Sequence, residues 1–189
     1  MIRKFSTGIM KASFAFIIIL SSQTIFAQAK DASPLSLYVH GLVGFSLEKS
    51  SQRAYKSQFG AVAGLGYNLK NNNTMLVGSI GYSAFPAKDK DQYGGNVAYI
   101  PLKAGVRQSW PLSNNKIFVQ GNAGVAFLSS SATDRVPASS DTRFAFDFGV
   151  GTTIKDAFEA ALVWDNYKET EKLGWSSWLT LRLGYKMNF

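Results

Sequence analysis

His40 is the single histidine in this chain of 189 residues, which contains no cysteine. A serine hydrolase would need that histidine beside a serine and a carboxylate. Ser36 and Ser46 share one side of an extended segment with His40, but no short motif joins them. Without cysteine the chain has no disulfide and no thiolate metal ligand. We therefore expect no enzymatic activity, no cofactor and no metal site, and we interpret His40 as a hydrogen-bonded interior residue.

Charged residues form the second candidate group, because they alternate with apolar residues in extended segments. They are Lys103, Arg107, Asp147, Glu159, Asp165, Arg182 and Lys186. Alternation places them on one face of a sheet, and charges held away from water must be paired. With Glu48 near the rim, four carboxylates face four cations. Bridging groups are available from Gln120, Asn122, Thr180 and His40. We expect a neutral network that includes a Glu159–Lys186 pair and an Asp165–Arg182 pair.

The elements that must carry these residues are β-strands, because apolar residues recur with a period of two. Phe144, Phe146 and Phe148, for example, alternate with Ala145 and Asp147. Eight such segments are predicted, at about residues 35–47, 59–69, 74–85, 96–109, 117–127, 144–154, 158–167 and 175–189. A composition with 17 Gly, 14 Phe and 8 Tyr also favours β-structure.

The connections between these segments alternate between long and short. Residues 48–57, 87–95, 129–142 and 168–174 are the long ones, and residues 70–73, 110–116 and 155–157 are the short ones. We expect 129–142 to be the longest and 155–157 the tightest. Long outer loops, short periplasmic turns and an even strand number are typical of bacterial outer-membrane barrels. The sequence thus predicts an all-β fold, an eight-stranded antiparallel up-and-down transmembrane β-barrel with short periplasmic turns and longer extracellular loops.

Aromatic residues gather near both ends of the predicted strands, as expected for belts at the two membrane interfaces. At the turn end they are Tyr67, Trp110, Phe158, Tyr185 and Phe189. At the loop end they are Phe45, Phe59, Tyr82, Phe85, Phe127, Phe144, Trp164 and Trp175. The apolar face of each strand should then meet lipid, and the polar face should fill a narrow lumen.

The last eleven residues resemble the C-terminal signature of bacterial outer-membrane β-barrels. Leu179, Leu181 and Leu183 begin an apolar face that continues through Tyr185, Met187 and Phe189. The resemblance implies that the barrel-assembly machinery reads Tyr185, Met187 and Phe189. Residues 99–107 also resemble the Pro-Leu-x-x-Gly-x-Arg strand of such barrels. The mature chain as a whole resembles the small eight-stranded barrels of the OmpX/OmpA-transmembrane type, and the OmpW-like group.

The first 29 residues are typical of a secretory signal peptide. Arg3, Lys4 and Lys11 precede a short apolar run, and Ala27 and Ala29 fit an A-x-A cleavage site. The apolar run is shorter than the roughly 20 residues that a spanning helix needs. We expect cleavage after Ala27 or Ala29, leaving residues 30–189 as the outer-membrane barrel domain.

A net charge of +8, part of it in the signal peptide, is too mild and too evenly spread to indicate a nucleic-acid partner. The leading hypothesis is a non-enzymatic barrel in outer-membrane lipid with a structural or surface-interaction role, its lumen plugged by paired charges. An OmpW-like barrel that passes small apolar molecules is one alternative, since the inward face includes Tyr38, Leu42, Val62, Val77, Tyr99 and Trp178. A lipid-modifying barrel enzyme and a soluble lipocalin-like carrier are the others.

Overall fold

The computed structural model describes residues 34–69, 73–89, 95–134, 137–168 and 174–189. The predicted signal peptide, residues 1–29, lies outside this part of the chain. Within the described residues, no helix combines the length and apolar character needed to cross a membrane.

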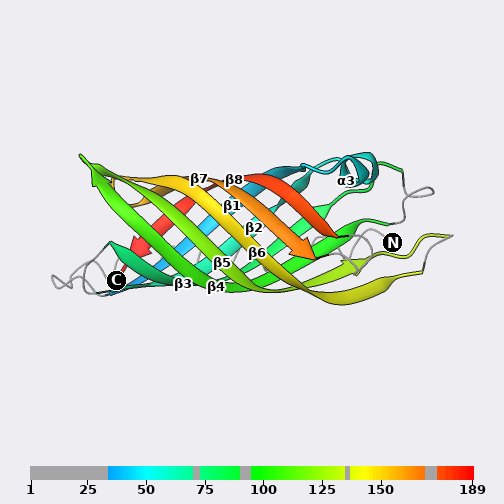
Figure 1. Cartoon of the computed structure of the whole chain (residues 1–189), viewed down its shortest axis with the longest axis horizontal. Helices are drawn as coiled ribbons and strands as arrows, with labels where there is room; N and C mark the ends of the chain where they lie inside the picture. Colours follow the sequence, from blue (N-terminus) through cyan, green and yellow to red (C-terminus); the bar gives the residue numbers. More distant parts are fainter. Residues whose placement is uncertain (1–33, 70–72, 90–94, 135–136, 169–173) are drawn as a thin grey trace, which may run out of the picture. The chain divides into compact units, whose positions relative to one another are not determined.

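The described residues form eight strands that close into a barrel (Figure 1). The strands are β1 (Leu35–Ser46), β2 (Gln58–Asn68), β3 (Thr74–Phe85), β4 (Val97–Leu112), β5 (Asn115–Ser130), β6 (Ser139–Ile154), β7 (Phe158–Lys168) and β8 (Trp175–Asn188). Each strand pairs antiparallel with the next, and β8 pairs with β1 to complete the ring. One short helix, α3 (Lys49–Ala54), lies in the β1–β2 connection. The predicted fold class is confirmed.

Side chains alternate across the barrel wall in the opposite sense to a water-soluble protein. In β8, Leu181 and Leu183 are exposed on the outside, whereas Thr180 and Arg182 are buried in the lumen. Apolar side chains of all eight strands are exposed in the same way. Because a continuous apolar surface over all eight strands is unfavourable in water, this surface is suited to lipid.

Two predictions about the connections are wrong. The tightest connection is 113–114, because β4 and β5 stay paired down to Leu112 and Asn115, and Ser113 adopts a φ of 54°. Pro111 does not end β4, since the last residues of a strand tolerate a missing N–H group. The β5–β6 connection, predicted to be the longest, spans only residues 131–138. It is shorter than the connections at 47–57 and 86–96, because the polar residues from Ser139 onward extend β6. Backbone pairing continues there without an apolar side-chain pattern.

The prediction for Phe85 is also wrong, because this ring lies inside the barrel and is 1% exposed. Phe85 shares its side of β3 with Ser83 and Val77, whereas Tyr82 and Ile80 face outward. Strand periodicity therefore assigns Phe85 to the lumen. All the other residues of the two predicted belts are exposed on the outer side of the barrel.

Candidate functional site

The interior of the barrel contains several groups of side chains, and we name three of them for their positions. A further buried cluster is apolar and consists of Tyr38, Leu42, Val62, Met75 and Val77. The turn-side network consists of Arg107, Glu159, His40, Gln120 and Thr153. The central network consists of Lys103, Asp147, Asp165, Arg182 and Asn122. The mouth cluster, at the loop end, consists of Phe85, Tyr99, Ala126, Ala145, Tyr167 and Trp178.

The central network exists because β6 and β7 place two carboxylates side by side. Asp147 and Asp165 are direct cross-strand partners, and like charges in such a pair repel. Lys103 Nζ lies 2.7 Å from Asp147 Oδ2 and 2.7 Å from Asp165 Oδ1. Arg182 Nη2 adds contacts of 3.4 Å and 3.5 Å to the same two carboxylates. Asn122 Nδ2 donates to Asp147 Oδ1 over 2.6 Å. Two cations thus balance two anions, all of them buried.

The turn-side network is built around Glu159, which is 0% exposed. Arg107 Nη1 donates to Glu159 Oε1 over 2.7 Å, and His40 Nε2 lies 3.0 Å from Oε2. The Thr153 hydroxyl donates to Oε1 over 3.0 Å. The Arg107 guanidinium also donates twice to Gln120 Oε1, over 3.1 Å and 2.8 Å. Each charged group here is paired, as burial requires.

Aromatic faces complete the environment of Arg107. Its guanidinium carbon lies 4.1 Å from the ring centroid of Phe118 and 5.3 Å from that of Tyr38. The Tyr38 ring in turn stacks on His40 with a centroid separation of 5.2 Å. A guanidinium over an aromatic face is stabilised by the ring quadrupole. The cation is therefore enclosed on its polar edge and on its faces.

Glu159 pairs differently from the sequence-based expectation. Among the described residues its ion-pair partners are Arg107 and His40, not Lys186. In the β7–β8 ladder Glu159 lies opposite Gly184, and the missing side chain of Gly184 admits the His40 ring. Lys186, two residues nearer the turn, is only partly buried. Arg182 does reach Asp165 as expected, although the ladder places it opposite Ala161.

The mouth cluster closes the loop end with rings. The Phe85 and Trp178 centroids lie 4.6 Å apart, and those of Tyr99 and Tyr167 lie 5.3 Å apart. The Tyr99 hydroxyl points down to Asp165 Oδ1, 3.3 Å away, and so links this cluster to the central network. Tyr55 packs edge-on against Phe85 at 6.2 Å. Rings in this arrangement leave no wide passage at the mouth.

The role of Tyr55 and of helix α3 was missed in the sequence because nothing in residues 48–57 has helical periodicity. The helix is held by contacts to β1 and β8. Gln52 Nε2 donates to the Ser46 carbonyl over 2.9 Å, and the Ser51 and Ser176 hydroxyls lie 3.5 Å apart. Ser46 ends β1, just before the helix, whereas Ser176 belongs to β8. Closure of the barrel brings Ser176 to the helix.

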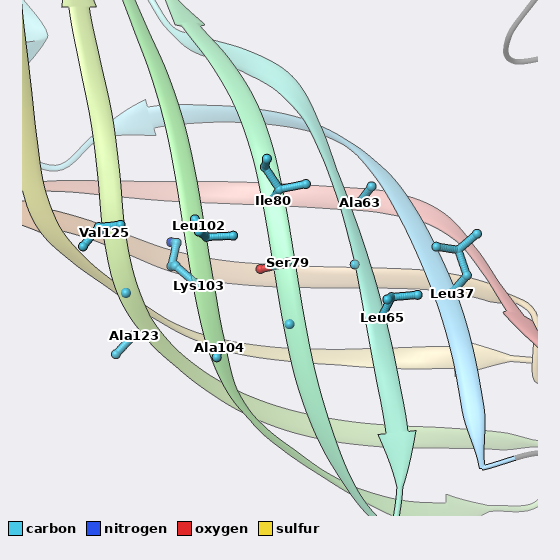
Figure 2. Close-up of a pocket in the computed structure, with 13 residues that line it drawn as sticks. Leu37, Ala63, Leu65, Ser79, Ile80, Leu102, Lys103, Ala104, Ala123 and Val125 are labelled. Carbon is cyan, nitrogen blue, oxygen red and sulfur yellow. The ribbon is translucent and has the colours of Figure 1, made fainter.

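A shallow hollow is one concave feature of the barrel surface (Figure 2). Its floor consists of small residues of β3, β4 and β5, namely Gly78, Ala104 and Ala123. Leucine and isoleucine side chains surround this floor. Most of the lining is apolar, but Ser79 and Lys103 also line the hollow. The Lys103 ammonium is held by Asp147 and Asp165, and the apolar remainder is suited to lipid.

A closed antiparallel barrel with an apolar outside and a charged, paired inside defines a transmembrane β-barrel of the bacterial outer membrane. Residues 12–188 match the model of the outer membrane protein beta-barrel domain family. The chain belongs to this family. No curated protein matches the chain at a significant level.

Three solved structures illustrate the fold. Neisserial surface protein A (NspA) aligns with a TM-score of 0.63 and 10% identity, over 85% of this chain and 100% of that chain. Ail, the attachment invasion locus protein of Yersinia pestis, aligns with a TM-score of 0.52 and 16% identity, over 82% and 99% of the two chains. The outer membrane enzyme PagL aligns with a TM-score of 0.52 and 16% identity, over 79% and 98%. At these identities the likeness is one of fold.

Proposed function

We propose that this protein is a non-enzymatic outer-membrane barrel that is closed to ions and acts through its extracellular loops. The observation that carries the proposal is the filling of the lumen. The charges of the turn-side and central networks are paired over 2.7–3.5 Å, and rings fill the mouth. A hydrated conduit would instead leave lumenal charges solvated.

Planar-bilayer recording tests the closed lumen. We expect no steady conductance from the purified, folded wild-type protein. Folding is checked in parallel by the shift in gel mobility on boiling, which a closed barrel produces because it has no free strand edge. Long-lived channels in a fully heat-modifiable sample would reject the closed-lumen proposal.

The enzymatic alternative has a precedent in the fold, because PagL is an outer membrane enzyme. In this chain the chemistry of His40 argues against it. His40 is 3% exposed, faces the lumen and bonds to Glu159. Ser36, on the same strand, bonds to the Gly66 carbonyl and the Met75 sulfur. A lipid substrate would have to enter the packed lumen to reach them. Incubation with purified outer-membrane lipid should yield no hydrolysis product, and a product that disappears in His40→Ala would reverse this conclusion.

The OmpW-like alternative rests on the apolar residues of the lumen. Tyr38, Leu42, Val62 and Val77 form one buried cluster with Met75, whereas Tyr99 and Trp178 belong to the mouth cluster. Phe85, Tyr99 and Trp178 offer an apolar lining, but they contact one another and leave the space between them filled. Passage of a small apolar molecule would require these rings and Tyr55 to move apart. Uptake of such a molecule into protein-containing vesicles, faster than into empty vesicles, would favour this alternative.

A surface-interaction role is supported by the bridged β1–β2 and β3–β4 connections at the loop end and by one neighbour. Ail has been crystallised in complex with the heparin analogue sucrose octasulfate, so one barrel of this fold binds a ligand of that kind. In the present protein, the loops and not the lumen offer accessible side chains at the extracellular end.

Export and assembly complete the proposal. Residues 1–29 act as a signal peptide, cleaved after Ala27 or Ala29, and residues 30–189 are the mature barrel. The barrel-assembly machinery reads Tyr185, Met187 and Phe189, of which Tyr185 and Phe189 are exposed. Deletion of Phe189 should lower the amount of barrel in the outer membrane more than it lowers the stability of the refolded protein. Normal membrane levels of the deletion variant at native expression would refute the assembly role.

A further inference from the structure

The β1–β2 and β3–β4 connections form a single unit over the mouth of the barrel. Tyr55 and Ala87 make an isolated antiparallel bridge between them. Two backbone hydrogen bonds flank it, from Lys56 N to Pro86 O over 3.0 Å and from Lys88 N to Ala54 O over 2.8 Å. The Lys88 ammonium also donates to the Gln52 carbonyl of α3 over 2.6 Å. The unit is therefore fixed before any partner arrives, which lowers the entropy cost of binding.

Four cations of this unit are exposed. Ser51 of α3 is buried toward Ser176. Lys49 and Arg53 lie two residues before and after Ser51, about 160° around the helix from it. Tyr55 and Ala87 turn inward at the bridge, so Lys56 and Lys88, one residue further along each segment, turn outward. We call Lys49, Arg53, Lys56 and Lys88 the basic face.

In the described part of the two connections, the negative charges are fewer than the four positive charges of the basic face. The negative charges are those of Glu48 and Asp89. Partial desolvation raises the pKa of the Glu48 carboxyl above its usual value, which weakens its negative charge at low pH. At the same end of the barrel, Arg143 is already paired with Asp141. Lys168, at the end of β7, is also exposed. Four of the five exposed cations that the structure describes at the loop end therefore lie in the two connected loops.

We propose that the basic face binds an extended polyanionic glycan, of the sulfated polysaccharide class, across the mouth of the barrel. The proposal rests on the surface-interaction role given above and specifies its partner. Sulfate groups accept charge-assisted hydrogen bonds from lysine and arginine. A basic face with few apolar residues suits a highly charged, hydrated chain better than a protein surface, whose contact core is apolar and aromatic. Its outward direction suits a ligand in solution better than the phosphates of the surrounding membrane.

Binding of a heparin-derived octasaccharide to the folded protein in zwitterionic nanodiscs tests the proposal. The test variant combines Lys49→Gln with Arg53→Gln. The matched control combines Lys116→Gln with Lys155→Gln, which removes two cations from the turn end, Lys155 being exposed and Lys116 partly exposed and paired with Asp156. We expect the test variant to bind roughly tenfold more weakly than wild type, since each exposed contact contributes modestly. The control should match wild type, and high salt should weaken all binding.

Several outcomes would overturn the glycan proposal. They are absence of octasaccharide binding, equal binding of a desulfated octasaccharide, equal losses in the two double variants, and binding only to vesicles that contain anionic lipid. The last outcome would make the membrane the partner of the basic face. Heat-modifiable migration of each variant checks that it is folded. A failure of glycan binding with the lumen still closed to ions would remove this partner and leave the closed-barrel proposal standing.

Discussion

The charged networks of the lumen and its largest cluster of aromatic rings lie in different halves of the barrel. Toward the turns, Arg107 and Lys103 are held by buried carboxylates. Toward the loops, Phe85 and Trp178 pack ring against ring. A charged filling depends on complete pairing, because one lost partner leaves a buried charge. An apolar filling depends on volume, because one lost ring leaves a cavity. The lumen is therefore closed by two mechanisms that fail in different ways.

The largest loss of unfolding free energy is expected from Trp178→Ala, which removes one large ring from the mouth cluster. Loss of a buried tryptophan should lower the free energy of unfolding by about 3–5 kcal/mol. Trp175→Ala is the matched control, because Trp175 lies on the outer surface and is 40% exposed, against 2% for Trp178. Urea unfolding in detergent, followed by fluorescence, measures both. Equal losses would mean that the mouth is not packed.

Glu159→Ala removes the carboxylate of the turn-side network. It leaves Arg107 and His40 in the lumen without their carboxylate, and the free energy of unfolding should fall by about 3 kcal/mol, the lower end for a broken buried pair. Asp156→Ala removes a carboxylate three residues away, one whose 2.9 Å pair with Lys116 is exposed. That control should cost at most about 1 kcal/mol. If both variants unfold alike in urea, the lumen is hydrated and the contrast between its halves disappears.

Leu181→Arg tests whether both halves lie inside a lipid-facing wall. A cation on the outer face near mid-depth should cost roughly 2–4 kcal/mol of unfolding free energy. Leu112→Arg, at the turn end of β4, should cost about 0–1 kcal/mol, because an arginine there reaches the interface. Unfolding from lipid vesicles is the appropriate measurement. The reverse order of the two losses would place the apolar face away from the hydrocarbon core.

Tyr99→Phe makes the smallest change and probes the junction of the two halves. It removes the hydroxyl that bonds to Asp165 and keeps the ring in the mouth cluster. We expect a loss of about 1 kcal/mol, because Asp165 retains Lys103 and Arg182. Tyr82→Phe, on the outer surface, should have no measurable effect. A loss above that of Glu159→Ala would show that the two halves act as one unit.

The sequence alone determined which side chains face the lumen and which face lipid. Once a strand is recognised, its period of two assigns every side chain to one face. Phe85 lies two residues after Ser83 and could therefore have been assigned to the lumen. The same rule placed the charged residues together in the lumen. Strand ends were less determined, because Pro111 and the residues from Ser139 onward pair through the backbone without an apolar pattern.

Only the tertiary structure decided which lumenal partners meet. Lys103 of β4 reaches Asp165 of β7 across the barrel, and Arg107 of β4 reaches Glu159 of β7. Neither pair is adjacent in the sheet. Their contact depends on the narrow closed lumen and on the stagger accumulated around it, which no local pattern encodes. The same closure brings Ser176 of β8 to α3, the helix that carries Lys49 and Arg53 of the basic face.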